Sequence, residues 1–320
     1  MATARGANTR LLAQAESTYG TNPGGTDWRQ YAFNPPLNFG ATQPLTQSPT
    51  IGISTRRDPG SPFPEDVTVP LSFGLPMDLI DIGFWLKMLF GAPTTTNSGT
   101  DYTHVFKSGS FTALPSFTAE VGLVDLPRYM LYTGVKANTL TIGAKPGGRP
   151  AITLACVAQD EAESGTSVDS SPVLPASAYT EFNNYQAVLS RESTALSYAT
   201  DFTLNYSNNV DGIRDIGSGQ NIREAQEQDT SITGTLTERL AATTLMADAV
   251  AATYKAFDVL WQISATKSLQ LQLPRLWLER TGKAVQGRGG ISIPWRWQAE
   301  YDSTAGAALV MTLKNQTASY

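Results

Sequence analysis

The stretch DVTVPLSF, residues 66–73, decides the fold when it is read with the apolar run from Met77 to Phe90 that follows it. A related order recurs as DTSITGTL, residues 229–236, before a second apolar run from Leu240 to Tyr254. Apolar and polar residues alternate in both octapeptides, and a period of two predicts a strand with one buried face. Each apolar run predicts a helix. In both halves the helical run begins four positions after the last inward strand residue.

The flanking residues extend this match. Leu37-Asn38-Phe39 precedes the first strand and Leu204-Asn205-Tyr206 precedes the second, while the later strands are expected to end at turns formed by Thr133-Gly134 and Thr281-Gly282. Because order and spacing agree while identity is low, we interpret the chain as a duplication. The expected fold is β-rich (α+β): two duplicated antiparallel β-sandwich or half-barrel modules, each with one flanking helix.

The expected organisation is an N-terminal arm at residues 1–30, a first module at 31–165 and a second module at 166–320. Clustered turn residues indicate a loop rather than a core element in the arm. The polar segment from Gln159 to Pro175 is the natural seam, although Val188 to Ala199 could equally serve as the connector.

Two segments are expected to depend on neighbours. Residues 40–64 hold five prolines and predict a long extended loop, ordered only when a partner supplies contacts. The run from Met77 to Phe90 is apolar almost all round, so it must be covered on more than one side, by the chain itself or by a neighbouring subunit. Trp85 is expected to be a major part of that core.

Composition excludes several classes of protein. The 320 residues carry 23 basic and 28 acidic side chains, a net charge of −5, which argues against a nucleic-acid grip. One cysteine, Cys156, rules out an intrachain disulfide, and its place in an alternating strand predicts a buried, inert thiol. No secretory signal follows the N-terminus, and the most apolar run is too short to cross a bilayer.

No residues suggest catalysis, a metal or a cofactor. The chain has one histidine, His104, in an expected hairpin strand, so neither a zinc site nor a Ser-His-Asp arrangement can be assembled around several histidines. The glycine-rich stretches lack the ending of a P-loop and are expected to be turns. Trp295 and Trp297 continue an apolar stripe and are assigned to the core rather than to a carbohydrate platform.

Several motifs resemble a known family. The segments are Glu16 to Thr21, Phe202 to Val210, and Leu273 to Leu276 followed by Gly289-Gly290-Ile291. They are similar to the major tail tube proteins of siphovirus bacteriophages, and the resemblance extends from Ala13 to Asp302.

The resemblance implies a tail-tube-like fold and a structural, non-enzymatic role in the virion tail, after synthesis in the host bacterial cytoplasm. Rings would stack into a tube that contains the tape measure protein and later passes double-stranded DNA, with tail terminator and baseplate proteins as further partners and no membrane anchor. Most relatives have one module and form hexameric rings. A chain with two modules is therefore expected to form a pseudo-hexameric ring of three.

A DNA conduit should avoid rows of Lys and Arg, because cations bind phosphate by displacing counterions. The candidate lumen-facing residues are the outward hydroxyl, amide and acidic positions of the expected strands: Asp66, Thr68, Ser72, Thr118, Glu120, Ser231, Thr233, Thr235, Thr237, Gln270 and Gln272.

Two alternatives remain at this stage. One is a baseplate or capsid-decorating β-sandwich that binds a receptor or glycan. The other is a hydrolase whose acidic residues are scattered in the sequence.

Overall fold

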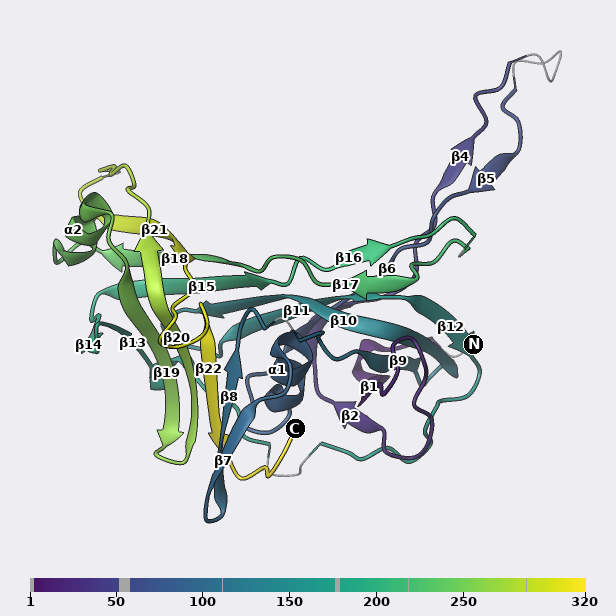
Figure 1. The fold of residues 1–320 in the computed structure, drawn as a ribbon, viewed down its shortest axis with the longest axis horizontal. Helices are drawn as coiled ribbons and strands as arrows, with labels where there is room; N and C mark the ends of the chain where they lie inside the picture. The colour runs from purple at the N-terminus through teal and green to yellow at the C-terminus, as the bar shows by residue number, and fades with distance from the viewer. Residues whose placement is uncertain (1–2, 52–57, 111, 176–178, 218, 286) are drawn as a thin grey trace.

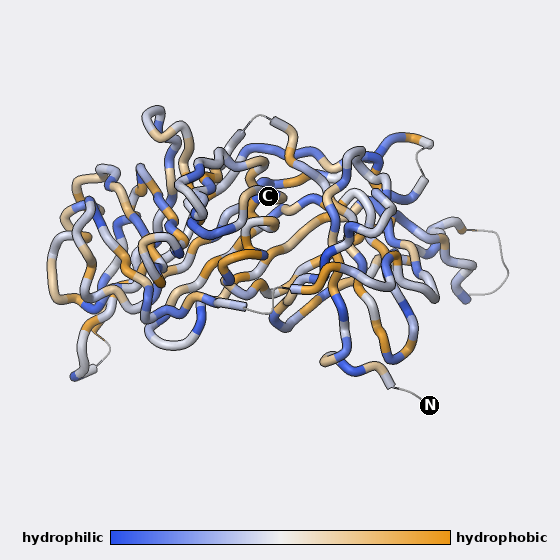
Figure 2. The backbone as a smooth tube through the Cα atoms, turned by 90° about the horizontal axis from the view of Figure 1, so that it is seen from below, coloured by the Kyte–Doolittle hydropathy of each residue, from blue (hydrophilic) through white to orange (hydrophobic). Residues whose placement is uncertain are grey.

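The structure is a computed structural model that describes residues 3–51, 58–110, 112–175, 179–217, 219–285 and 287–320. It is 49% strand and 8% helix, and the strands form one large, open antiparallel sheet with two small hairpins (Figure 1). Hydrophobic segments run mainly through the interior of the elongated chain, with hydrophilic loops at its periphery (Figure 2). The fold class expected from the alternating patterns is confirmed.

The described residues of the first half form a short 3-10 helix, η1 (Gly6–Asn8), followed by twelve strands and one α-helix. These are β1 (Thr9–Ala15), β2 (Arg29–Tyr31), β3 (Asn34–Asn38), β4 (Leu45–Gln47), β5 (Pro62–Pro64), β6 (Val69–Leu75), α1 (Ile82–Phe90), β7 (Thr94–Ser98), β8 (Asp101–Lys107), β9 (Phe117–Leu123), β10 (Arg128–Ala144), β11 (Ala151–Ala158) and β12 (Asp160–Ser164).

In the part of the second half that the structure describes, a 3-10 helix, η2 (Asn184–Gln186), again comes first, and ten strands and one α-helix follow. These are β13 (Ala187–Arg191), β14 (Thr194–Ala195), β15 (Ala199–Ser207), β16 (Asp211–Ile213), β17 (Glu224–Gln226), β18 (Ser231–Arg239), α2 (Thr244–Ala251), β19 (Lys255–Ser264), β20 (Lys267–Leu278), β21 (Ser292–Ala299) and β22 (Val310–Asn315).

The two halves repeat one topology. Neighbouring strands of the first follow the order β2–β1–β9–β10–β11–β6–β3, and those of the second follow β14–β13–β19–β20–β21–β18–β15. A small hairpin precedes β6 (β4–β5) and β18 (β16–β17). The last strand of each half, β12 or β22, pairs with the N-terminal part of β10 or β20. The described residues add one hairpin, β7–β8, to the first half alone.

The sequence motifs mark this repeat imperfectly. Leu37 pairs with Phe73 in the first half, whereas Phe202, not Leu204, pairs with Leu236 in the second. The Leu-Asn-aromatic motifs are therefore offset by two residues. The Thr-Gly pairs are not equivalent either, because Thr133-Gly134 lies within β10 and Thr281-Gly282 follows β20. Gly134 has φ +59° beside an irregularity in the β9–β10 register, so the expected turn there is wrong.

The halves are joined through their sheets. The C-terminal part of β10 pairs with β15, so that β6, β11, β10, β15, β18 and β21 lie side by side. At the other end, β22 pairs with β8 of the inserted hairpin. Strands β8, β19, β20 and β22 run across the direction of β10 and β15 in Figure 1. The sheet is thus strongly bent between β21 and β22.

Helix α1 packs in the core beneath the sheet. The Trp85 ring lies 4.9–5.7 Å, between centroids, from the rings of Tyr31, Phe73 and Phe117, and only 2% of Trp85 is exposed. Cover comes partly from the C-terminus, where the Tyr320 hydroxyl donates to the Ile80 carbonyl (2.7 Å). The apolar run was expected to be covered either by the chain itself or by a neighbouring subunit, and the structure shows cover by the chain itself.

Several predictions on single elements can be settled. Cys156, Trp295 and Trp297 are buried as expected, and burial raises the pKa of the Cys156 thiol. His104 lies in β8, where its Nδ1 is 2.9 Å from Thr95 Oγ1. Both helices are shorter than their apolar runs. Residues 1–30 are not simply a loop, because β1 lies within the sheet with Leu11 buried.

Candidate functional site

The six joined strands from β6 to β21 have one apolar and one polar face. Alternate residues such as Phe73, Leu154, Leu140, Leu204 and Leu236 are buried on the side of α1. The residues between them point to the opposite side, which no other element of the described residues seals from solvent. This surface, formed by strands of both halves, is called the polar face below.

Hydroxyl and amide side chains form aligned rows on the polar face. Cross-strand pairing places in one row the exposed residues Thr153 (β11), Thr141 (β10), Asn205 (β15), Thr233 (β18) and Gln298 (β21). The neighbouring row contains Ser72, Thr139, Ser207 and Ser231. Side chains in a row stand close enough for direct contact across the strands.

Hydrogen bonds connect residues of the polar face across the strands. Thr141 Oγ1 donates to Asn205 Oδ1 at 3.1 Å, and the hydroxyl oxygens of Thr203 and Thr235 lie 2.6 Å apart. Pairing of this kind leaves fewer free donors and acceptors while the groups remain hydrated. The polar face is therefore an exposed surface of hydroxyl and amide groups, some of which are paired with one another.

Charged groups lie at one end of the polar face and on its β21 edge. Asp201 of β15 forms an ion pair with Lys145 at 3.3 Å, Arg239 is exposed at the end of β18, and Arg296 of β21 is exposed opposite Thr235. Between these groups the rows of β6, β11, β10, β15 and β18 are uncharged. A polyanion passing over them would meet no row of cations.

The polar face includes five of the sequence-predicted lumen residues. Ser72 lies on β6, and Ser231, Thr233, Thr235 and Thr237 follow one another on β18. Their outward direction agrees with the strand parity read from the sequence.

Asp66 and Thr68 lie just before β6, at the root of the β4–β5 hairpin. Asp66 forms an ion pair with Arg214 at 3.1 Å, and the hydroxyl oxygen of Thr68 is 2.7 Å from that of Thr42. Both residues are exposed, and they adjoin the polar face without belonging to its rows.

Thr118 and Glu120 are corrections to the predicted set. Both are buried in β9, with 0% and 1% exposure, so they do not line a water-filled surface of this chain. Thr118 Oγ1 donates to Glu16 (2.7 Å), and Glu120 accepts from Ser167 Oγ and Val168 N (both 2.7 Å). The segment after β12 covers the polar side of β9, which strand parity could not reveal.

Gln270 and Gln272 lie elsewhere. They are half-buried on β20, in the part of the sheet that runs across the six joined strands, and Gln270 Nε2 is 3.5 Å from Asp258 Oδ1. The structure does not bring them together with the residues of β6 and β18.

Sequence reasoning missed half of the polar face. Thr139, Thr141, Thr153, Asn205 and Gln298 are as central as the predicted positions. The alternation around Leu140-Ile142 and Leu204-Tyr206 contained the signal. The sequence did not reveal that β10 pairs with β15, the pairing that joins the sheets of the two halves into one.

A separate feature projects from this part of the molecule. The β4–β5 hairpin extends far from the rest of the chain (Figure 1), and the centre of its connecting segment, 52–57, lies outside the described residues. The shorter β16–β17 hairpin is its topological counterpart.

The fold is thus an open, β-rich sheet with a repeated topology and a polar face of hydroxyl and amide rows. The sequence matches the family of phage tail tube proteins over residues 6–299 of its 320. The chain belongs to this family. No curated protein matches it.

Membership of the family establishes the general role. The protein is a structural component of the virion that self-assembles into the tail tube and contacts other tail components. No helix formed by the described residues is long and apolar enough to cross a membrane.

Proposed function

We propose that three copies of the chain close into a ring in which six modules surround a lumen. The observation that supports this is the repeated strand order, together with the β10–β15 ladder that joins the two modules of one chain. Closed cyclic symmetry satisfies every repeated contact of one kind. If each module occupies one sixth of the circle, the intrachain junction replaces every second interface of a six-module ring.

The division of the chain is part of this proposal. The first module would end near residue 165, after β12, and the second would begin with the segment that leads to η2. The N-terminal residues up to 30 would contribute β1 and β2 to the first module, with the segment before β1 left to contact a neighbour.

The polar face is proposed to line the lumen. Its hydroxyl and amide rows, with Ser72, Thr141, Asn205 and Thr233 among them, present hydrogen-bonding groups without fixed positive charge. DNA affinity for proteins depends chiefly on Lys and Arg contacts to phosphate. Such a wall lets double-stranded DNA, and before it the tape measure protein, slide without a sequence of strong binding sites.

The β4–β5 hairpin is proposed to contact the next ring of the stack. It projects from the sheet, and its first arm, residues 40–51, contains no charged side chain, whereas the sequence of the connecting segment and the second arm carries Arg56, Arg57, Asp58 and Glu65. Terminator and baseplate proteins would meet the same surfaces at the tube ends. These assignments fit the tail of a siphovirus.

Lysine substitutions test the lumen assignment. Thr141→Lys with Thr233→Lys adds two cations per chain to exposed positions, so tubes should still form. We expect these tubes to retain short duplex DNA at low salt and to release it as salt is raised. Wild-type tubes should retain little.

Val250→Lys is the matched control, because Val250 is 56% exposed on α2, away from the polar face. Equal DNA retention by the control and the double variant would contradict the lumen assignment. Receptor or glycan binding, the alternative function, gains no support from the family.

A further inference from the structure

We propose that the ring closes by strand addition between residues 37–42 of one chain, which are the end of β3 and the segment after it, and residues 279–284 of the next, the segment after β20. This inference rests on the proposed ring and names the surfaces that form it. The partner is a second copy of the same chain. Each chain already contains one ladder of the proposed kind, the pairing of β10 with β15 that joins its two modules.

The intrachain junction is the template. β15 of the second module pairs antiparallel with the C-terminal part of β10 of the first, from Ala144–Phe202 to Thr139–Ser207. In the repeated topology β3 is the counterpart of β15, and β20 is the counterpart of β10. Within the described residues, β3 pairs with β6 on one side and has no strand on its other edge.

The register defines the counterpart of the β10 segment. Thr139 pairs with Ala155, and Ala155 with Ser72. In the second module the Glu279 N–H donates to the Arg296 carbonyl at 2.8 Å, and Arg296 pairs with Thr235. Residue 279 is therefore equivalent to 139, and residues 279–284 are equivalent to 139–144.

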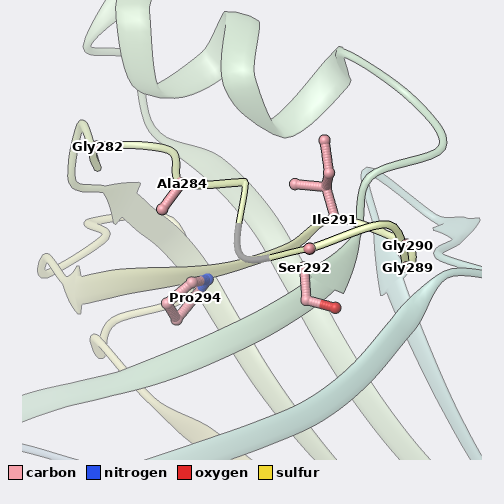
Figure 3. A pocket seen from close by; sticks show the side chains of 8 residues that line it. Gly282, Ala284, Gly289, Gly290, Ile291, Ser292 and Pro294 are labelled. Carbon is pink, nitrogen blue, oxygen red and sulfur yellow. The ribbon is translucent and has the colours of Figure 1, made fainter.

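The end of the β10–β11 hairpin differs from the end of the β20–β21 hairpin, as the proposal requires. In the first module the β10–β11 ladder continues to Gly143–Ala151, where β15 supports its other edge. In the second module the β20–β21 ladder stops at Leu278. Beyond it the two arms separate around a cavity of about 500 Å³ between Gly282-Ala284 and Ile291-Pro294 (Figure 3). A hairpin end without a supporting strand is open in the isolated chain.

An apolar groove lies where the neighbouring loop would fit. It is about 770 Å³, is formed by η1, β1, β2 and β3, and includes Leu11, Tyr31, Phe33, Leu37 and Phe39. The equivalent space beside η2, β13 and β15 is about 420 Å³, because the β10–β11 loop at residues 144–147 forms one of its walls.

The loop after β20 has a suitable apolar side chain. Val285 is 75% exposed in the single chain. In the proposed ring it enters the groove of the next chain, where burial of its side chain would favour assembly.

The free edges of the chain also differ in charge. β12 carries Asp160, Glu161 and Glu163, and charged side chains protect an edge strand from pairing. From Gln30 to Ile51, a stretch that includes β3, no residue is charged. The edge at Leu37 and Asn38 is therefore open to another strand, whereas the β12 edge is not. The Ala41 N–H, further along, donates to Glu161 Oε2 at 2.9 Å in the single chain and would exchange this bond for one to the added strand.

The register can be stated to the residue. Gly143 pairs with Thr203 inside the chain, and the equivalent interchain pair is Lys283 with Asn38. Side-chain contacts support the alignment, because Asn38 Nδ2 donates to Ser72 Oγ at 3.2 Å just as Thr203 contacts Thr235.

A disulfide test uses the double variant Asn38→Cys with Lys283→Cys. Facing residues of paired strands have Cα atoms close enough to be bridged. Cys156 is buried and does not compete. After oxidation of assembled tubes, denaturing non-reducing electrophoresis should show covalent dimers and then trimers as the largest species. A series that ends at hexamers would support the interface and overturn the three-chain ring.

The matched control is Gly143→Cys with Thr203→Cys, which should form its disulfide within one chain. A Cβ at Gly143 comes no closer than 3.8 Å to another residue, so this control is tolerated. If this control is oxidised and tubes of the first pair show no interchain disulfide, the proposed interface is wrong while the tube function stands. Wild-type protein that never forms rings would instead overturn the proposed function.

A second variant keeps the proposal testable if the cysteine pair does not assemble. Val285→Glu should leave the melting temperature of the free chain unchanged and reduce tube formation at least tenfold, since a carboxylate would enter the apolar groove. Val250→Glu, on exposed α2, should assemble as the wild type does. Normal assembly of Val285→Glu would overturn the interface.

Discussion

Helices α1 and α2 occupy the same place in the repeated topology but have different surroundings. Most of α1 is buried, including Trp85 and Leu86, whereas α2 buries Leu245, Asp248 and Ala249 and leaves Val250 56% exposed. The comparison shows that duplication preserved the strand order while only one helix became the centre of a large core.

The cause lies in elements that only one of the helices touches. The β7–β8 hairpin is inserted after α1, and the C-terminal Tyr320 packs on α1 so closely that a Cβ at Gly83 would lie 2.2 Å from its ring. Asn315 Nδ2 also donates to the Leu79 carbonyl at 2.6 Å. The C-terminal residues therefore cover the helix of the first half.

Trp85→Ala should give the largest difference between the helices. Trp85 is 98% buried and its ring contacts four other aromatic rings, so its removal should cost about 3–5 kcal/mol of unfolding free energy. Val250→Ala on α2 should change it by less than about 0.5 kcal/mol. Chemical denaturation of both variants measures the contrast, and equal losses would remove the distinction between the helices.

The second prediction concerns pH and the start of α1. The Asp78 carboxylate accepts hydrogen bonds from the N–H groups of residues 80–82 at 2.7–3.0 Å, while burial raises its pKa to about 6. Ionisation is therefore less favourable in the folded chain than in the unfolded one. The contribution of this carboxyl to stability is fullest below about pH 4 and is lost as pH rises through about 6, by about 3 kcal/mol.

Asp78→Asn should remove that part of the pH dependence. Thermal melting of the wild type and the variant between pH 4 and 7 tests this, because other carboxyl groups contribute alike to both. Parallel curves would show that Asp78 does not titrate in this range. Thr243, at the start of α2, makes no side-chain hydrogen bond to the helix, and its hydroxyl does not titrate between pH 4 and 7. A substitution at Thr243 should therefore leave the pH dependence of stability unchanged.

The smallest effect is expected from Tyr320→Phe. This change keeps the aromatic ring on α1 and removes the hydroxyl that donates to the Ile80 carbonyl and accepts from Asn315 at 2.6 Å. A loss of about 1 kcal/mol is expected, the usual net value of a hydrogen bond. Unchanged stability would mean that packing of the ring alone seals the helix.

Local patterns predicted much of the fold. Strict alternation identified the faces of β6, β18 and β21, and it placed Trp295 and Trp297 in the core, because burial on one side of a strand acts on every second residue. The strand-then-helix order in both halves also predicted the duplication. These features depend on residues close together in the sequence.

Features that depend on distant partners were missed. The burial of Thr118 and Glu120 follows from the path of the segment around Ser167, and the polar face follows from the β10–β15 ladder. The Leu-Asn-aromatic motif suggested equivalence but was offset by two residues. Low identity between modules lets a short motif recur out of register, so only strand pairing defines which residues correspond.

An electron-microscopy reconstruction of tubes assembled from the purified protein tests the proposed ring most directly. We expect three chains per ring, six modules around the lumen, and the row of Thr141, Asn205 and Thr233 facing inward. Six chains per ring, or a lumen lined by the helices, would contradict it.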